Sequence, residues 1–186
     1  MNTRALNAIL QKLGDQRHWF VSDHGLRLFF NGESRNTFNT ALSRHVRAGL
    51  MTRLSPGLYL NPYAQKPLYA LENLACFLRP FDFFYLSLES ALHESGHISQ
   101  IPNRLTFMTD GPSYTYETPI GIIEFTHTRR PVDSWLCQTE RDAARGLRVA
   151  STELALSDLK HVRRSLDLPK HINEEADDEA NFPGNH

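Results

Sequence analysis

The first 62 residues combine three amphipathic stretches with a Pro-Gly turn between two apolar runs, and few folds accept that order. Residues 3–13 repeat apolar side chains at helical spacing, and Ser22 and Ser34 stand where N-caps begin two further helices. Residues 51–60 place short apolar runs on both sides of Ser-Pro-Gly, a pattern that predicts a β-hairpin. Three helices followed by a hairpin is the order of a winged helix-turn-helix, so we expect one over residues 1–62.

The remainder of the chain mixes helical and strand patterns after a boundary expected at Asn61-Pro62. An apolar helix is predicted at residues 68–79, and Ser87 and Ser151 are the expected N-caps of two more helices. Strands are predicted at residues 83–86, 104–109, 114–117, 120–126 and 147–150. This order predicts an α+β fold in which residues 63–168 form a small mixed α/β domain with a partly antiparallel sheet. Residues 169–186 are polar and acidic, so we expect a disordered tail there.

Charge is distributed unevenly along a chain whose formal net charge is only −1. Residues 1–62 hold eight Lys and Arg against three Asp and Glu, residues 63–168 hold eleven against thirteen, and residues 169–186 hold one against five. Only the first segment is therefore expected to contact a polyanion. Sixteen of the twenty cations are Arg, whose planar guanidinium suits phosphate and guanine better than the Lys ammonium does.

The third predicted helix, from Ser34 to about Ala48, is the strongest candidate for a nucleic-acid contact. Its apolar side chains share one face, and the opposite face carries polar and basic residues without a carboxylate. The predicted DNA contacts are Arg35, Asn36, Asn39, Thr40, Ser43, Arg44 and Arg47 on this face, and Arg53 beside the hairpin turn. Arg pairs with guanine, Asn with adenine, and Ser or Thr with bases or phosphate, which is what a helix in the major groove requires. The alternative is an ordinary solvated face, but such faces usually mix Glu and Asp with Lys.

An enzymatic alternative comes from residues 93–97, which read HESGH and match the H-E-x-x-H pattern of zinc peptidases. In such a zinc-dependent hydrolase His93 and His97 would bind the metal one helical turn apart, and Glu94 would polarise the bound water. Gly96 instead predicts a helix end before the second His, and no third ligand follows on a downstream helix. The chain also lacks Walker A, G-x-G-x-x-G and G-x-S-x-G motifs. We therefore expect no catalytic residue, no metal and no cofactor.

The expected compartment follows from what the sequence lacks. No apolar run reaches the roughly eighteen residues of a transmembrane helix, and the amphipathic N-terminus does not read as a secretory signal. Cys76 and Cys137 stand far apart, which argues against a disulfide scaffold or a zinc finger and fits a reducing environment. These features predict a cytoplasmic protein with no membrane partner.

A family resemblance covers about residues 35–160 and rests on five stretches in order. Residues 51–59, MTRLSPGLY, resemble the wing of the AbiEi antitoxins, and residues 85–96, YLSLESALHESG, resemble their Y-x-S-x-x-S-A-L-x-x-x-G helix. Residues 101–109, IPNRLTFMT, and residues 120–125, IGIIEF, resemble the two strands that follow. Residues 150–159, ASTELALSDL, resemble the A-x-P-E-x-A-L-x-D-L helix, with Thr152 where Pro is usual.

The resemblance implies a function that periodicity alone does not reach. AbiEi proteins are antitoxins of bacterial type IV toxin–antitoxin systems, and they repress their own operon through an N-terminal winged helix. Their cognate toxins resemble nucleotidyltransferases. The expected partners are therefore double-stranded DNA of the chain's own promoter and a nucleotidyltransferase-like toxin. The oligomeric state is left open, and a homodimer is one of the alternatives. Some relatives are stand-alone transcription factors without a toxin, and this remains the alternative within DNA-binding proteins.

Overall fold

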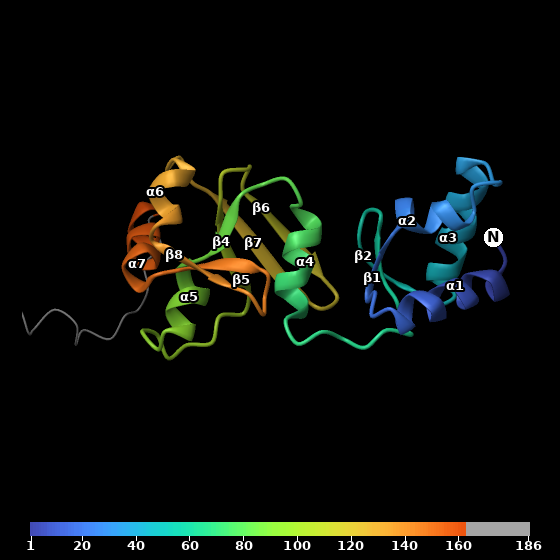
Figure 1. Ribbon diagram of the computed structural model, residues 1–186, viewed down its shortest axis with the longest axis horizontal. Coiled ribbons are helices and arrows are strands. Elements are labelled where there is room, and N and C mark those ends of the chain that lie inside the picture. Colours follow the sequence, from blue (N-terminus) through green and yellow to red (C-terminus); the bar gives the residue numbers. More distant parts are fainter. Residues whose placement is uncertain (163–186) are drawn as a thin grey trace, which may run out of the picture.

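The computed structural model describes residues 1–162, arranged as a first lobe (residues 1–60) and a second lobe (residues 70–162) joined by a short linker (Figure 1). The fold is α+β, as expected, with seven helices and two sheets in the described range. The tail expected at residues 169–186 lies outside that range, as do residues 163–168. Between residues 1 and 162, no helix has the length and apolar character needed to cross a bilayer.

The first lobe contains three helices and three short strands. In chain order they are α1 (Thr3–Asp15), β1 (Phe20–Ser22), α2 (Asp23–Phe29), α3 (Arg35–Arg47), β2 (Thr52–Ser55) and β3 (Leu58–Leu60). The predicted N-caps are confirmed, because the Ser22 hydroxyl accepts a hydrogen bond from the Gly25 amide and the Ser34 hydroxyl accepts one from the Thr37 amide. The predicted hairpin is β2 and β3, whereas β1 had no recognisable signal in the sequence.

The three strands form a small antiparallel sheet, in the order β1-β3-β2, that is covered on both faces. Val21 pairs with Tyr59, and both side chains pack into the cluster formed by the helices of the first lobe. Their neighbours Phe20, Leu54 and Leu58 face the other way and pack with residues of the second lobe. The apolar side chains of the second lobe in this shared cluster are Leu74, Ala75, Leu86, Phe107, Ile123, Phe125 and Leu147. Alternation along the strands therefore joins the two lobes through one buried cluster.

The second lobe is a six-stranded mixed sheet in the order β6-β7-β5-β4-β9-β8. Its elements are α4 (Ala70–Leu78), β4 (Phe84–Leu86), α5 (Leu88–Glu94), β5 (Leu105–Thr109), β6 (Tyr114–Thr118), β7 (Gly121–His127), α6 (Val132–Leu136), β8 (Thr139–Asp142), β9 (Leu147–Ala150) and α7 (Thr152–His161). The β4–β9 and β5–β7 pairs are parallel and the other pairs are antiparallel, so the expected partly antiparallel sheet is confirmed. The patterns in the sequence did not predict α6 or β8.

The linker is fastened to the first lobe at the expected boundary. Asn61 is fully buried, and its amide donates hydrogen bonds to the carbonyl oxygens of Leu10 (2.8 Å) and His18 (3.1 Å). A Cβ atom on Gly14 would lie 2.7 Å from the carbonyl oxygen of Tyr63, so only glycine lets α1 and the linker approach this closely. Across the junction, the ring centroids of Phe20 and Phe77 lie 5.1 Å apart.

Truncating an aromatic ring at this junction should destabilise both lobes together. Phe20→Ala should lower the free energy of unfolding by about 3–5 kcal/mol because it opens a cavity in the shared cluster. Chemical denaturation followed by circular dichroism should still show one transition, at lower denaturant. Phe81→Ala is the matched control, because that ring is 93% exposed and its loss should change stability by no more than about 0.5 kcal/mol. An unchanged midpoint for Phe20→Ala would contradict the shared cluster.

Candidate nucleic-acid interface

Helix α3 presents the predicted contact residues on one exposed face. Phe38 and Leu42 are buried in one cluster with side chains of α1 and α2, which fixes the rotation of the helix. All seven contact residues predicted on this helix are exposed, namely Arg35, Asn36, Asn39, Thr40, Ser43, Arg44 and Arg47. His45, which the sequence did not single out, is also buried, with Nε2 3.5 Å from the carbonyl oxygen of Met1. The structure thus brings seven of the eight predicted residues together on a single helix.

The guanidinium groups of this face are not neutralised by acidic side chains. Within residues 1–162, none of Arg35, Arg44, Arg47 and Arg53 forms an ion pair with a carboxylate. The carboxylate nearest in sequence, that of Glu33, contacts the Met1 nitrogen instead. The first turn of α3 contains no acidic residue either. The face therefore keeps a positive charge that a polyanion can neutralise.

The eighth predicted residue, Arg53, lies on β2 rather than on α3. It pairs with Tyr59 across the sheet, so its side chain is on the face that carries the helices. The side chain is exposed, and its Nε donates to the carbonyl oxygen of Ser55 at 3.3 Å. Arg53 is therefore available on the same side of the lobe as α3.

The hairpin turn is held between α2 and the second lobe. The Asp23 amide donates to the Gly57 carbonyl oxygen at 2.8 Å, and Gly57 has a φ of +78°, which a side chain rarely adopts. Pro56 and Gly57 share a cavity with Phe77 and Tyr116. The turn is thus fixed in place between the two lobes.

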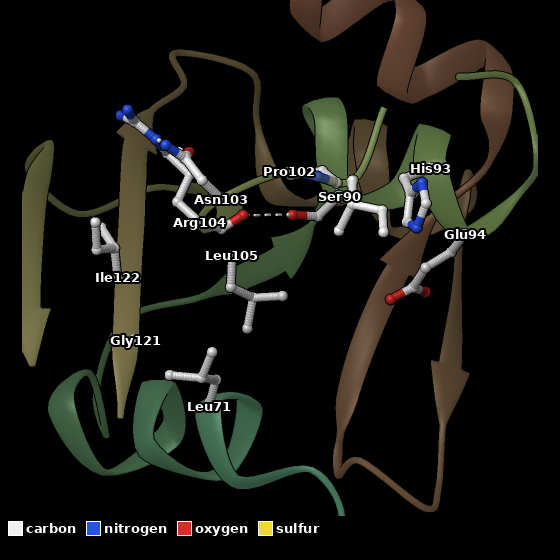
Figure 2. Close-up of a pocket in the computed structure, with 11 residues that line it drawn as sticks. Leu71, Ser90, His93, Glu94, Pro102, Asn103, Arg104, Leu105, Gly121 and Ile122 are labelled. Atoms are coloured by element: carbon white, nitrogen blue, oxygen red, sulfur yellow. Dashed lines mark hydrogen bonds between the residues drawn. The ribbon is translucent and has the colours of Figure 1, made fainter. Parts of the chain in front are cut away.

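A second pocket, of about 220 Å³, lies in the second lobe and is lined in part by His93 and Glu94 of the HESGH motif (Figure 2). Its walls include the apolar side chains of Leu71, Leu105 and Ile122, and α5 contributes Ser90, His93 and Glu94. The Ser90 hydroxyl donates to the Arg104 carbonyl oxygen (3.3 Å) and lies 3.0 Å from the Thr106 hydroxyl. No hydrogen bond joins Ser90 to His93 among the described residues, so the pocket does not contain a paired nucleophile and base.

The zinc-peptidase geometry is not formed at this pocket. Helix α5 ends at Glu94, and Gly96 adopts a φ of +77°, which confirms the helix end predicted there and takes His97 off the helix. Both carboxylate oxygens of Glu94 accept hydrogen bonds from Nη1 of Arg145, at 2.7 and 2.8 Å. In the chain up to residue 162, no three His, Cys, Asp or Glu side chains are grouped closely enough to hold a metal ion. His93, Glu94 and His97 therefore do not form a metal centre in this conformation.

The sequence did not predict a buried polar cluster in the second lobe. Asp158 on α7 is fully buried, and its Oδ2 accepts hydrogen bonds from the Tyr85 hydroxyl (3.0 Å) and the Ser87 hydroxyl (2.8 Å). Nε of Arg130 lies 3.5 Å from Oδ1. Burial raises the pKa of Asp158, and burial beside that carboxylate raises the pKa of Tyr85, which keeps the phenol a donor.

Ser87 illustrates why this cluster was missed. It occupies the N-cap position of α5, as expected, but its hydroxyl makes no capping hydrogen bond and is directed to Asp158 instead. Residues 87 and 158 are distant in the sequence, and the only signal was the polar character of both positions in otherwise apolar segments.

Comparison with models of known protein families and with curated proteins found no match to this chain.

The full chain should not retain zinc. After incubation with zinc chloride and desalting, elemental analysis should find far less than one zinc per chain, because Glu94 is paired with Arg145 and His97 lies off α5. His93→Ala is the control and should give the same residual content. One zinc per wild-type chain, lost in His93→Ala, would show that the motif rearranges into a metal site.

Proposed function

We propose that this chain is a non-enzymatic DNA-binding regulator whose first lobe is a winged helix-turn-helix with α3 as its recognition helix. The observation that carries the proposal is the exposed face of α3, where polar and basic side chains stand without an acidic partner among residues 1–162. Arg44 and Arg47 reach base edges or phosphates of the major groove, and Asn36 and Asn39 read adenine. Arg53 adds a phosphate or minor-groove contact from β2.

The topology of the first lobe supports this proposal. Its element order is α1-β1-α2-α3-β2-β3 and its sheet order is β1-β3-β2, and a winged helix-turn-helix would require three helices followed by a hairpin in this order. Helix α2 packs against α3 through the cluster around Leu26 and Phe38, and this fixes the helix that enters the groove.

We further propose that the protein represses its own promoter and acts as the antitoxin of a type IV toxin–antitoxin system in the cytoplasm, opposing a nucleotidyltransferase-like toxin. The support is the AbiEi resemblance of residues 35–160. Two stretches that carry it, residues 85–96 and 150–159, meet in the second lobe, where Tyr85 and Ser87 donate to Asp158. The second lobe is slightly acidic in sequence, so a role other than binding DNA suits it.

The alternative is a stand-alone winged-helix transcription factor, in which the second lobe serves another purpose, such as dimerisation. A gene for a nucleotidyltransferase-like protein next to this one would favour the antitoxin. A zinc-dependent hydrolase has less support, because Glu94 is paired with Arg145 and α5 ends at Glu94, before His97.

Loss of the α3 cations should weaken duplex binding. Arg44→Ala and Arg47→Ala should each cost about 1–3 kcal/mol if the side chain meets a base edge, which is roughly a 5- to 150-fold loss of affinity. The measurement is a gel shift of the full chain with DNA from upstream of its gene. Lys12→Ala, which removes an exposed cation from α1 and leaves α3 unchanged, is the control. Equal affinity of the double variant and the wild type would exclude α3 as the recognition helix.

The antitoxin proposal predicts that DNA binding and toxin neutralisation are separable within the full chain. Co-expressed with a toxin encoded by a neighbouring gene, the wild type should relieve growth arrest. The full-length Arg44→Ala/Arg47→Ala variant should do so equally well from an independent promoter, because its second lobe is intact. Continued arrest with the wild type would remove the antitoxin function and leave a transcriptional regulator.

A further inference from the structure

A cavity of about 320 Å³ lies between α2 and α3, on the first lobe. It is lined by Asp23, His24, Arg27, Arg35, Phe38 and Asn39. We propose that this cavity binds one phosphate group of the DNA backbone, with Arg27 and Arg35 as the cationic ligands. The proposal rests on the proposed DNA-binding function and adds to it a positioning site on α2.

Arg27 is the first observation that points to an anion. Its guanidinium has no hydrogen-bond or ion-pair partner among residues 1–162, and its Nη1 is shielded from solvent without a partner. Asp23 stands four residues earlier on the same helix, where an ion pair with Arg27 is expected. No such pair is present in the described part of the chain, and Oδ1 of Asp23 accepts a hydrogen bond from the His24 amide at 2.6 Å. A partly buried cation without an acceptor is costly, and a phosphate would supply one.

Arg35 supplies the second cation from the opposite wall. It is the first residue of α3, a helix of 13 residues whose first turn contains no acidic side chain. The helix dipole therefore adds positive potential at the end of α3 that borders the cavity. A guanidinium donates two parallel hydrogen bonds to phosphate oxygens, so two such groups on facing walls suit a single phosphate.

The remaining polar groups of the cavity set its selectivity. Asp23 is its one carboxylate, and it is turned toward its own helix N-terminus and the hairpin turn, where a Cβ on Gly57 would lie 3.2 Å from Oδ1. His24 and Asn39 are exposed and offer further donors. The cavity thus contains two arginine side chains and one carboxylate, and Oδ1 of that carboxylate already accepts a hydrogen bond.

The position of the cavity favours the DNA backbone as the source of the phosphate. Arg35 and Asn39 belong both to the cavity and to the exposed face of α3, so an anion bound here lies directly beside the residues that meet the bases. Such a contact carries no sequence information, but it fixes how deeply and at what angle α3 enters the groove.

The test compares the full-length variants Arg27→Gln and Lys12→Gln, each of which removes one cation from the first lobe. Each phosphate contact adds a slope of about −0.9 to the plot of log affinity against log salt. The affinity advantage of the wild type over Arg27→Gln should therefore shrink by about 3.5-fold between roughly 50 and 200 mM salt. This should hold equally for the operator and for unrelated duplex, and Lys12→Gln should keep the wild-type slope.

Arg27→Lys and chemically modified DNA provide a test that does not depend on Arg27→Gln folding well. A methylphosphonate removes the negative charge of a single phosphate, and it is placed at one operator position after another. At one of these positions the affinities of the wild type and of Arg27→Lys for the modified operator should be equal. An Arg27→Gln slope equal to that of the wild type, or the absence of such a phosphate, would overturn the site while leaving α3 as the recognition helix. Failure of the wild type to bind any duplex would overturn both proposals.

Discussion

Burial of both faces of the β1-β3-β2 sheet is the constraint on which the arrangement of this protein depends. One set of alternating side chains, including Val21 and Tyr59, packs against the helices of the first lobe. The other set, including Phe20 and Leu58, packs into the second lobe. Because successive side chains of a strand point to opposite faces, a shift of register by one residue would exchange the two sets and uncover both clusters. The sheet therefore fixes the position of α3 relative to the second lobe.

Buried polar interactions complement this apolar junction. Asn61 ties the start of the linker to α1, and Asp158 ties α7 to β4 through Tyr85. Such groups are costly to bury without partners, so they favour one arrangement of the segments they join. With the scaffold held in this way, the arginines on the outer face of α3 and Arg27 in the α2–α3 cavity have no acidic partner among residues 1–162.

The sequence predicted the elements that carry local signals. Helices with apolar periodicity and N-caps, such as those after Ser22 and Ser34, and the hairpin around Pro56, were placed correctly because their determinants lie within a few neighbouring residues. The strand β8 is short and polar, and only its pairing with β9 makes it a strand. The cavity containing Arg27 was not predictable either, because the expected local partner, Asp23, gave no sign that its carboxylate would turn to His24.

The shared cluster also has a consequence for how such a protein can evolve. A recognition lobe whose strands are solvated on their outer face can be exchanged between genes as an independent module. Here an exchange would have to bring compatible residues on α4 and β7 with it, since Leu54 and Leu58 pack with Leu74 and Phe125 in one cluster. Replacement of the whole first lobe is therefore disfavoured, and its exposed surface, including the outer face of α3, is expected to change by single substitutions instead.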